Sequence, residues 1–182
     1  MTIIIYLIGK PGTGKYSIAK ELALHDYIIC DNQLINNPIF SLLQYDGLMQ
    51  VPLFAWTTIS KIRNAVFDFL KEEKSHNYVL TNVLYCDEYD LFAKVEQIAH
   101  ERHSLFVPVK LLINQEEHIK RIQNKERLLR FKSIDINDTS PEKQLINIIH
   151  PNLLELDVTY LSAKAAANII LTFIKTISVE TE

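Results

Sequence analysis

The sequence GKPGTGKYS, residues 9–17, decides the fold of this chain. The apolar run at 3–8 comes directly before it and predicts a fully buried strand. From Ile18 onward the apolar residues have the spacing of a helix with one buried face. Three of the chain's four glycines lie in this stretch, as expected where the backbone takes positive φ or approaches a ligand closely. A strand, a glycine-rich loop with a lysine, and a helix, in this order, predict a phosphate-binding loop.

In such a loop, successive backbone N–H groups form an anion-binding nest, and the helix adds the positive end of its dipole. Lys15 is expected to reach the β- and γ-phosphates of a nucleotide as a point charge. The expected nucleotide-binding residues of the loop are Gly9, Pro11, Gly12, Thr13, Gly14, Lys15, Tyr16 and Ser17. The alternative is a sharp strand-to-helix turn whose lysine has no ligand.

One position departs from the usual pattern. The residue after the lysine is normally Ser or Thr, whose short hydroxyl binds Mg²⁺. Here it is Tyr16, whose phenol lies too far from its own Cα to replace that contact. Ser17 follows, about 100° further around the helix, and is better placed for the α-phosphate. The sequence therefore predicts nucleotide binding with an unusual metal site. Ser17 and Asp31 are the candidate Mg²⁺ ligands, and an ion held only through water is the alternative.

Length and composition are those of one domain with a sizeable core: 182 residues, 48% apolar and 23% charged. A net charge of −3 gives no reason to expect a nucleic-acid or membrane surface. The sequence has no apolar stretch long enough to span a bilayer and no recognisable export signal. Cys30 and Cys86 are interpreted as buried thiols in a reducing compartment. We therefore expect a single cytoplasmic domain over 1–182, monomeric or homodimeric, whose partners are a nucleotide and a small molecule.

Strands and helices alternate along the rest of the chain. After the first strand, further strands are expected at 27–30, 78–84, 105–113 and 153–157. Further helices are expected from Pro52, Asp87, Asn114, Ser140 and Ser162. Pro38 is expected to break the chain before one or two helical turns, and Pro108 predicts a bulge or edge exposure in its strand. The alternation predicts a parallel α/β sheet with right-handed crossovers.

Ligands of such sheets gather at the carboxyl ends of the strands. Asp31 and Asn32 follow the second strand, and Asp31 is a candidate general base for a substrate hydroxyl or, alternatively, a turn residue that caps the next segment. Asn82 is polar within an apolar strand and should have a specific partner, either the substrate or a structural hydrogen bond. Arg63 is a candidate for holding an anionic substrate group, with a surface ion pair as the alternative. Nearby aromatic residues are interpreted as core rather than pocket: Phe40, Tyr45, Phe54 and Trp56.

A basic stretch runs from 121 to 132 within this acidic protein. Arg121, Arg127 and Arg130 recur near helical spacing, so that several guanidinium groups are expected to face one way. In a phosphoryl-transfer enzyme, a mobile lid supplies charge to the transition state from such a segment. The loop-like stretch 133–139 favours a lid over about 123–140. The alternative is a solvated helix face balanced by neighbouring acidic residues.

Taken together, these features resemble the small P-loop kinases of the nucleoside-monophosphate kinase superfamily, which include shikimate kinase, gluconate kinase and chloramphenicol phosphotransferase. The matching pieces are the phosphate loop, Asp31, the arginine stretch and the residues 154–159 before the last helix. The chain is also similar to bacterial proteins labelled as AAA-family or P-loop ATPases. These carry a similar G-K-Y-[ST] step and a similar DN-x-LINNP-x-F stretch, here residues 31–40.

The resemblance implies a three-layer P-loop NTPase fold, with a five-stranded parallel sheet in the order 2-3-1-4-5, helices on both faces and a small lid. It places adenine near 158–161, which makes Thr159 and Arg121 expected nucleotide contacts. It places the substrate between the second strand and the helices that follow, and it implies ATP and Mg²⁺ as cofactors. The Gly-Gly pair that shikimate kinases carry after the third strand is absent, so shikimate is not the expected acceptor.

The leading hypothesis is therefore an ATP-dependent kinase whose acceptor is a small-molecule hydroxyl or phosphate. Lys15 would hold the phosphates and Asp31 would orient or deprotonate the acceptor. Arg121, Arg127 or Arg130 would stabilise the transferring phosphoryl group. A nucleotide-binding regulatory or partner module with little or no phosphotransfer is the alternative that Tyr16 motivates. A plain ATPase, with water as acceptor, is a third.

Overall fold

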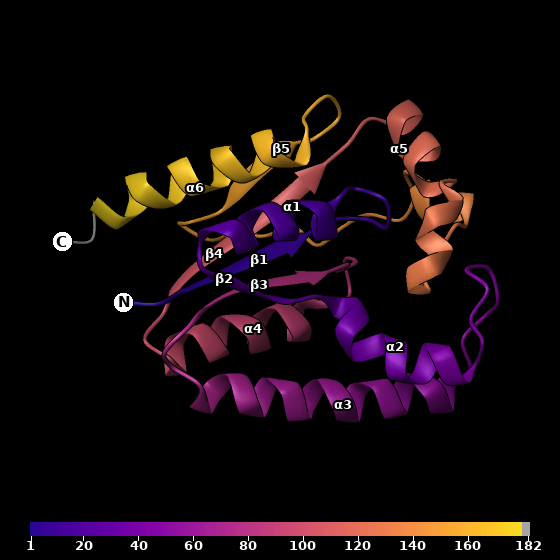
Figure 1. Ribbon diagram of the computed structural model, residues 1–182, viewed down its shortest axis with the longest axis horizontal. Helices are drawn as coiled ribbons and strands as arrows, with labels where there is room; N and C mark the ends of the chain where they lie inside the picture. Colours follow the sequence, from indigo (N-terminus) through magenta and orange to yellow (C-terminus); the bar gives the residue numbers. More distant parts are fainter. Residues whose placement is uncertain (180–182) are drawn as a thin grey trace.

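The computed structural model describes residues 1–179. In this part of the chain, five parallel strands form one sheet in the order β2-β3-β1-β4-β5 (Figure 1). The strands are β1 (Ile3–Ile8), β2 (Tyr27–Cys30), β3 (Asn77–Asn82), β4 (Leu105–Leu112) and β5 (Leu154–Asp157). The predicted fold class and strand order are confirmed.

Helices cover both faces of the sheet and make it the middle of three layers (Figure 1). The α-helices are α1 (Lys15–Leu22), α2 (Asn32–Leu42), α3 (Leu53–Glu72), α4 (Tyr89–Glu101), α5 (Gln115–Ile122) and α6 (Ala163–Val179). Three short 3₁₀ helices are η1 (Ala23–His25), η2 (Lys125–Arg130) and η3 (Ile136–Thr139). Helices α1 and α6 lie on one face and α3 and α4 on the other, while α2 and the α5–η2 segment stand at the carboxyl ends of the strands.

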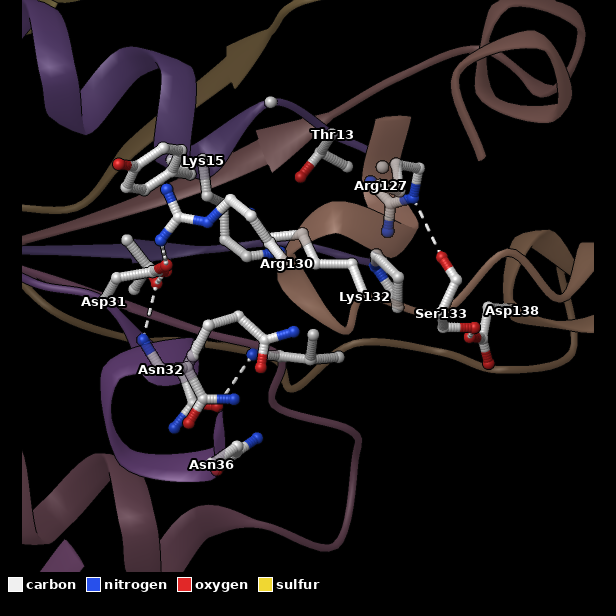
Figure 2. A pocket seen from close by; sticks show the side chains of 18 of the residues that line it. Thr13, Lys15, Asp31, Asn32, Asn36, Arg127, Arg130, Lys132, Ser133 and Asp138 are labelled. Atoms are coloured by element: carbon white, nitrogen blue, oxygen red, sulfur yellow. Dashed lines mark hydrogen bonds and ion pairs between the residues drawn. The ribbon is translucent and has the colours of Figure 1, made fainter. Parts of the chain in front are cut away.

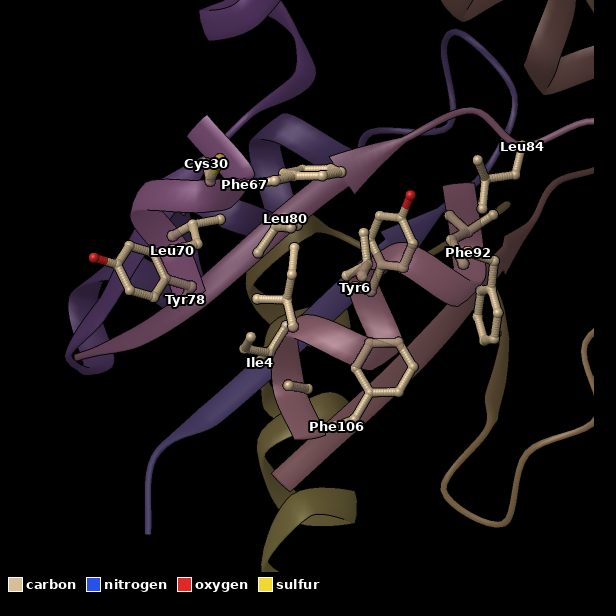
Figure 3. Close-up of a cluster of buried hydrophobic side chains, with 14 of the residues drawn as sticks. Ile4, Tyr6, Cys30, Phe67, Leu70, Tyr78, Leu80, Leu84, Phe92 and Phe106 are labelled. Atoms are coloured by element: carbon tan, nitrogen blue, oxygen red, sulfur yellow. The ribbon is translucent and has the colours of Figure 1, made fainter. Parts of the chain in front are cut away.

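Strand β1 lies at the centre of the sheet and is apolar on both sides, as a strand covered on both faces must be. Ile4, Tyr6 and Ile8 point into the cluster beneath α3 and α4, where the Tyr6 ring lies 6.3 Å from Phe92 and 6.4 Å from Phe106 (Figure 3). The alternate residues of β1, Ile5 and Leu7, point into the cluster beneath α1 and α6. The two cores fix the carboxyl end of β1, and hence the phosphate loop, in the middle of the molecule.

Two expectations about helices are wrong. Pro38 does not break the chain, because α2 runs through it. A proline inside a helix costs roughly 3 kcal/mol, and here the helix is held by the packing of Ile35 and Phe40 around Ile59 of α3. No helix begins at Ser140: a single turn follows it, in which the Lys143 N–H donates to the Ser140 carbonyl at 3.2 Å. Ile146 and Ile148, further along, are both buried in the core beneath α4.

Two further details are corrected. Pro108 causes no bulge and is buried, since the β4 register with β1 is continuous across it. Pairing of β4 with β5 begins only at Val109. Pro108, which has no backbone N–H, therefore lies before the first β4 residue that pairs with β5. Cys30 is a buried free thiol as expected, but Cys86 is exposed, since β3 has already ended at Asn82. No helix within residues 1–179 has the length and apolar character needed to cross a membrane.

Candidate active site

The loop between β1 and α1 takes the conformation that its glycines allow. Gly12 and Gly14 have φ of +93° and +92°, in the left-handed region that side chains rarely adopt. Gly9 has no such torsion, but a Cβ there would lie 2.7 Å from the Oγ1 of Thr13. Thr13 is buried, and its hydroxyl donates to the Lys10 carbonyl at 3.0 Å. The two left-handed glycines and the buried Thr13 therefore hold the loop in a tight turn before α1 begins.

Lys15 folds back over the loop. Its Nζ donates to the carbonyl oxygens of Gly9 and Lys10, the second at 2.9 Å. Burial, together with the nearby cations Lys132 and Arg127, lowers the pKa of Lys15 to about 7. The ammonium group is thus fixed at the loop and, within residues 1–179, forms no ion pair with a carboxylate, which favours an anionic ligand.

A buried histidine supports the loop from below. His118 of α5 is only 2% exposed, and its Nε2 donates to the Pro11 carbonyl at 2.7 Å. Burial lowers the pKa of His118, which keeps the ring neutral while one nitrogen still donates. A Cβ on Gly12 would touch this ring at 3.4 Å. The loop therefore rests directly on α5, the helix that leads into the arginine stretch.

A cavity of about 1060 Å³ opens at the carboxyl ends of the strands (Figure 2). Most of the expected site residues line it: Pro11, Gly12, Thr13, Gly14, Lys15, Tyr16, Ser17, Asp31, Asn32, Arg63, Asn82, Arg121, Arg127 and Arg130. Gly9 and Thr159 are not among the lining residues. The Thr159 hydroxyl instead accepts from the Asn114 N–H at 2.9 Å and so connects the β5–α6 loop to the start of α5.

Asp31 lies at the centre of the cavity wall, between the phosphate loop and α2 (Figure 2). It is 5% exposed, and both of its carboxylate oxygens have partners. The Thr81 hydroxyl of β3 donates to Oδ1 at 2.5 Å, and Arg130 reaches Oδ2 at 3.2 Å. The same Thr81 oxygen accepts from the Asn32 N–H at 3.1 Å and so fixes the first turn of α2. Asp31 is therefore held in one orientation by neighbouring elements.

Tyr16 lies under the basic stretch. The guanidinium carbon of Arg130 is 3.4 Å from the centroid of its ring, and the Nζ of Lys132 is 4.7 Å away. Lys20, one turn further along α1, is 5.5 Å away. The aromatic face thus receives cations from both α1 and the η2 segment.

The predicted lid segment, which follows α5, contacts α2 and the loop between α2 and α3. The Ile134 N–H donates to the Gly47 carbonyl at 3.1 Å, and a Cβ on Gly47 would lie 2.6 Å from Leu128. The Gln33 side chain of α2 donates to the Phe131 carbonyl at 3.0 Å. The predicted lid segment therefore spans the cavity from α5 to the α2–α3 loop.

The three arginines of this stretch have different partners. Arg121 donates to the carbonyls of Val158 and Thr159 at 3.1 and 2.9 Å, and to Glu117 at 2.8 Å, which connects α5 with the β5–α6 loop. Arg127 donates to the Ser133 carbonyl at 2.8 Å (Figure 2). Arg130 reaches across the cavity to Asp31, as described above. All three line the cavity, and their guanidinium groups bond to different elements rather than to one. Their role in phosphoryl transfer stays a prediction.

The far side of the cavity combines amides, one arginine and aromatic rings. Arg63 of α3 donates to Asn32 at 3.1 Å and to Asn36 at 3.3 Å, while its buried Nε has no hydrogen-bond partner within residues 1–179. Burial lowers the pKa of Arg63. The Asn82 side chain accepts from the Val83 N–H at 2.9 Å, which is a structural bond, yet the residue also lines the cavity.

The aromatic residues of this side are not simply core. Phe40 is buried, and its ring centroid lies 4.7 Å from the tilted ring of Tyr45 and 5.7 Å from the edge-on ring of Trp56. All three residues line the cavity. Phe54 is 69% exposed. The interpretation of these rings as core is therefore wrong for Phe54 and incomplete for the others.

The two candidate Mg²⁺ ligands, Ser17 and Asp31, lie in different surroundings. Ser17 is exposed, and both oxygens of Asp31 are already bonded. Tyr16 stands where the motif has a hydroxyl ligand, and Arg130 covers its ring. Within residues 1–179 there is no group of three or more His, Cys, Asp or Glu residues that could hold a metal ion. Ser17 and Asp31 both line the cavity and stay predicted ligands of an ion that would be shared with a nucleotide.

The part of the cavity next to the phosphate loop carries a local excess of positive charge. Lys15, Arg127, Arg130 and Lys132 converge at one end of the cavity (Figure 2). Burial and the neighbouring arginines lower the pKa of Lys132 to about 8, although Asp31 opposes the shift. Among the ion pairs of residues 1–179, only the one between Arg130 and Asp31 involves any of the four cations. This concentration of charge beside a backbone nest suits a polyphosphate.

Comparison with known proteins identifies the architecture. No family model matches the sequence, and no curated protein matches it. Among solved structures, a gluconokinase from Sinorhizobium meliloti is similar over 98% of this chain and 95% of its own, with a TM-score of 0.67 and 12% identity. The fold is that of the small P-loop kinases.

Two further structures share the P-loop kinase fold. A sugar kinase from Janibacter covers 96% of this chain and 95% of its own, with a TM-score of 0.65 and 12% identity. A shikimate kinase from Acinetobacter baumannii, in complex with shikimate, covers 97% and 94%, with a TM-score of 0.57 and 15% identity. At these identities the similarity defines the fold of this chain and does not identify a substrate.

Some residues of this candidate site are not among the predicted site residues. Lys132 belongs to the basic stretch, and Thr81 is a polar residue within a strand, so both carry a signal that the sequence analysis leaves unused. His118 carries none, because its contact with Pro11 joins residues 107 apart in the chain. Asn36 is not expected to face the site, because a chain break is expected here, where the structure has helix α2.

Proposed function

We propose that this protein is an ATP-dependent phosphotransferase that transfers the γ-phosphoryl group of ATP to a hydroxyl or phosphate of a small molecule. The observation that carries the proposal is the cavity itself, which has a phosphate loop and four cations at one end and a buried carboxylate, Asp31, between that end and a polar pocket. Phosphoryl transfer depends on positioning and charge stabilisation more than on covalent chemistry. The arrangement provides both.

On the donor side, the loop amides and Lys15 would bind the β- and γ-phosphates. Arg127 and Arg130 would stabilise the charge that spreads over the transferred group. Arg121, which is bonded to the 158–159 carbonyls, would position the adenine side of the nucleotide. Mg²⁺ would enter with ATP and would add to the charge neutralisation that these side-chain cations provide.

On the acceptor side, Asp31 and Asn32 would orient the attacking hydroxyl. Arg63, which has a buried Nε without a partner in the described residues, would recognise a carboxylate or phosphate of the acceptor. Asn82 would contribute an amide donor at the base of the pocket. Asp31 is the candidate base, and its bonds to Thr81 and Arg130 support a role in fixing the geometry of the acceptor hydroxyl.

The test combines binding with turnover. ATP binding is measured by calorimetry on wild type and on Lys15→Ala, with Lys94→Ala, at an exposed position of α4, as the matched control. ADP formation is then followed with small polyols, with the same compounds bearing a carboxylate or phosphate, and with nucleoside monophosphates. Binding that needs Lys15, followed by turnover that needs both an acceptor and Asp31, supports the proposal. ADP release at one rate with or without an acceptor would indicate an ATPase instead.

A second candidate is a nucleotide-binding module with little phosphotransfer, and the contact between Tyr16 and Arg130 favours it, because an altered metal position reduces catalysis more than binding. In this case ATP binds with dependence on Lys15 but no acceptor is phosphorylated. Tyr16→Thr should then raise turnover, and unchanged turnover in this variant would count against the module.

A further inference from the structure

The tyrosine that replaces the hydroxyl residue of the motif is the first residue after the loop lysine and belongs to the first turn of α1. Its ring forms a stacking surface for Arg130, whose guanidinium carbon lies 3.4 Å from the ring centroid. The same guanidinium is held from a second direction by Asp31, at 3.2 Å. An aromatic face and a carboxylate together fix both the position and the orientation of the planar group.

The backbone after Arg130 delivers a second cation to the same ring. Phe131 has φ of +50°, in the left-handed region that is rare for bulky residues. This torsion turns the chain so that Arg130 and Lys132, on either side of it, both reach Tyr16. The Phe131 carbonyl is in turn bonded by Gln33 of α2. The placement of cations on Tyr16 is thus supported by the backbone and by a contact across the cavity.

We infer that Tyr16 is a positioning residue that holds Arg130 beside the phosphate loop, so that side-chain cations supply the charge neutralisation that a hydroxyl-bound metal ion supplies in the usual motif. The inference rests on the proposed binding of a nucleotide at this loop. A Ser or Thr at position 16 has no aromatic face. A tyrosine in its place therefore removes a metal ligand and, at the same time, provides a ring on which an arginine stacks. Nucleotide affinity should therefore depend only weakly on Mg²⁺.

The experiment measures ADP binding by calorimetry in excess Mg²⁺ and in EDTA, on wild type, Tyr16→Phe, Tyr16→Leu and Tyr16→Thr. For wild type, removal of Mg²⁺ should weaken binding by less than about threefold, because charged hydrogen bonds from fixed cations remain. Tyr16→Leu should weaken binding in EDTA by about five- to thirtyfold, which corresponds to the loss of a partly buried cation–π contact. Tyr16→Phe, which retains the ring, should rescue most of this loss.

Tyr16→Thr gives the sharpest comparison, because it removes the ring and restores the hydroxyl. Its affinity in EDTA should fall as in Tyr16→Leu, while its affinity in Mg²⁺ should recover, so that the ratio of the two rises to about tenfold or more. Arg130→Gln should lose affinity in EDTA to the same extent as Tyr16→Leu. Tyr89→Leu, the same substitution at an exposed tyrosine outside the cavity lining, is the matched control, and thermal melts report whether each variant is folded.

The measurements distinguish a failure of the positioning role of Tyr16 from a failure of the proposed nucleotide binding. If wild type shows the same strong Mg²⁺ dependence as Tyr16→Thr, or if Tyr16→Leu binds in EDTA as wild type does, the positioning role is wrong while nucleotide binding stands. If wild type binds no nucleotide with or without Mg²⁺, the proposed function itself fails, and the inference fails with it. Equal losses in Tyr16→Phe and Tyr16→Leu would show that the hydroxyl, and not the ring, matters.

Discussion

Nucleotide affinity should fall steeply as the pH rises from about 7 to about 9, because two lysines of the site have a pKa close to neutrality. Burial and the surrounding cations lower the pKa of Lys15 to about 7 and that of Lys132 to about 8. Phosphates bound next to them would raise both toward the ordinary lysine value of about 10.4. A pKa that is higher in the complex than in the free protein means that binding takes up protons. Binding therefore strengthens as the pH falls.

The size of the effect follows from the two pKa values. At a pH of about 9, protonating Lys15 on binding costs about a hundredfold in affinity and protonating Lys132 about tenfold, because each pH unit above the free pKa is a factor of ten. The product, about a thousandfold or about 4 kcal/mol, is the upper limit for complete recovery of both charges. Between a pH of about 6 and 7 these lysines should contribute little. The terminal phosphate of the nucleotide titrates near a pH of about 6, so its contribution falls in that lower range.

Calorimetry in buffers of different ionisation enthalpy measures this uptake directly. At a pH of about 8.5 we expect between one and two protons per nucleotide bound. Lys132→Arg should lower the number by about one, because a guanidinium stays charged throughout this range. Lys94→Ala, on the exposed face of α4, should leave it unchanged. A binding constant that is flat from a pH of about 7 to 9, with heats that do not depend on the buffer, would refute the reasoning.

Three further predictions concern the support of the loop and the stability of the fold. Gly12→Ala should lower the free energy of unfolding by roughly 1–2 kcal/mol in urea titrations and reduce nucleotide affinity, because the left-handed torsion of +93° is strained for any other residue. His118→Leu should weaken nucleotide binding measured by calorimetry several-fold, since it removes a hydrogen bond of about 1 kcal/mol to the Pro11 carbonyl and frees the loop. Arg102→Met should destabilise the protein by about 2 kcal/mol or more in the same urea titrations with unchanged ADP affinity, because it leaves the buried Leu70 carbonyl, bonded at 2.6 Å, without its donor.

The parts of the fold that could be predicted are those in which local pattern and tertiary packing agree. Apolar strands between helices with one buried face specify the parallel sheet, and the glycine-rich loop after β1 marks the phosphate-binding end of that strand. The resemblance then supplies the strand order, which the structure confirms. The α2 helix is different, because the local signal of Pro38 opposes a helix and only the packing of Ile35 and Phe40 on α3 overrides it. The residues after Ser140 show the reverse, since a good helix start is overridden by the burial of Ile146 and Ile148.

The composition of the site could be predicted better than its geometry. The arginine stretch, Asp31 and the loop lysine are recognisable as residue types at expected places. Which arginine reaches Asp31 depends on the left-handed torsion at Phe131 and on the close packing of Leu128 against Gly47, and neither leaves a pattern in the sequence. Pairing between residues about a hundred positions apart requires the folded chain.

Tyr16 illustrates why such a departure from a motif is better judged in the structure than in the sequence. Considered locally, it removes a metal ligand and weakens the site. In the folded chain it lies under Arg130 and Lys132, so the same residue gathers positive charge at the loop. Within residues 1–179 that charge is paired with one carboxylate, Asp31. Burial first, and then repulsion from the neighbouring cations, lowers the pKa of Lys15. A polyphosphate would relieve this repulsion, so the loop, the tyrosine and the basic stretch all favour the same kind of ligand. If Tyr16 only filled space, Leu would replace it without loss, which makes this substitution the most direct test of whether the departure has a function.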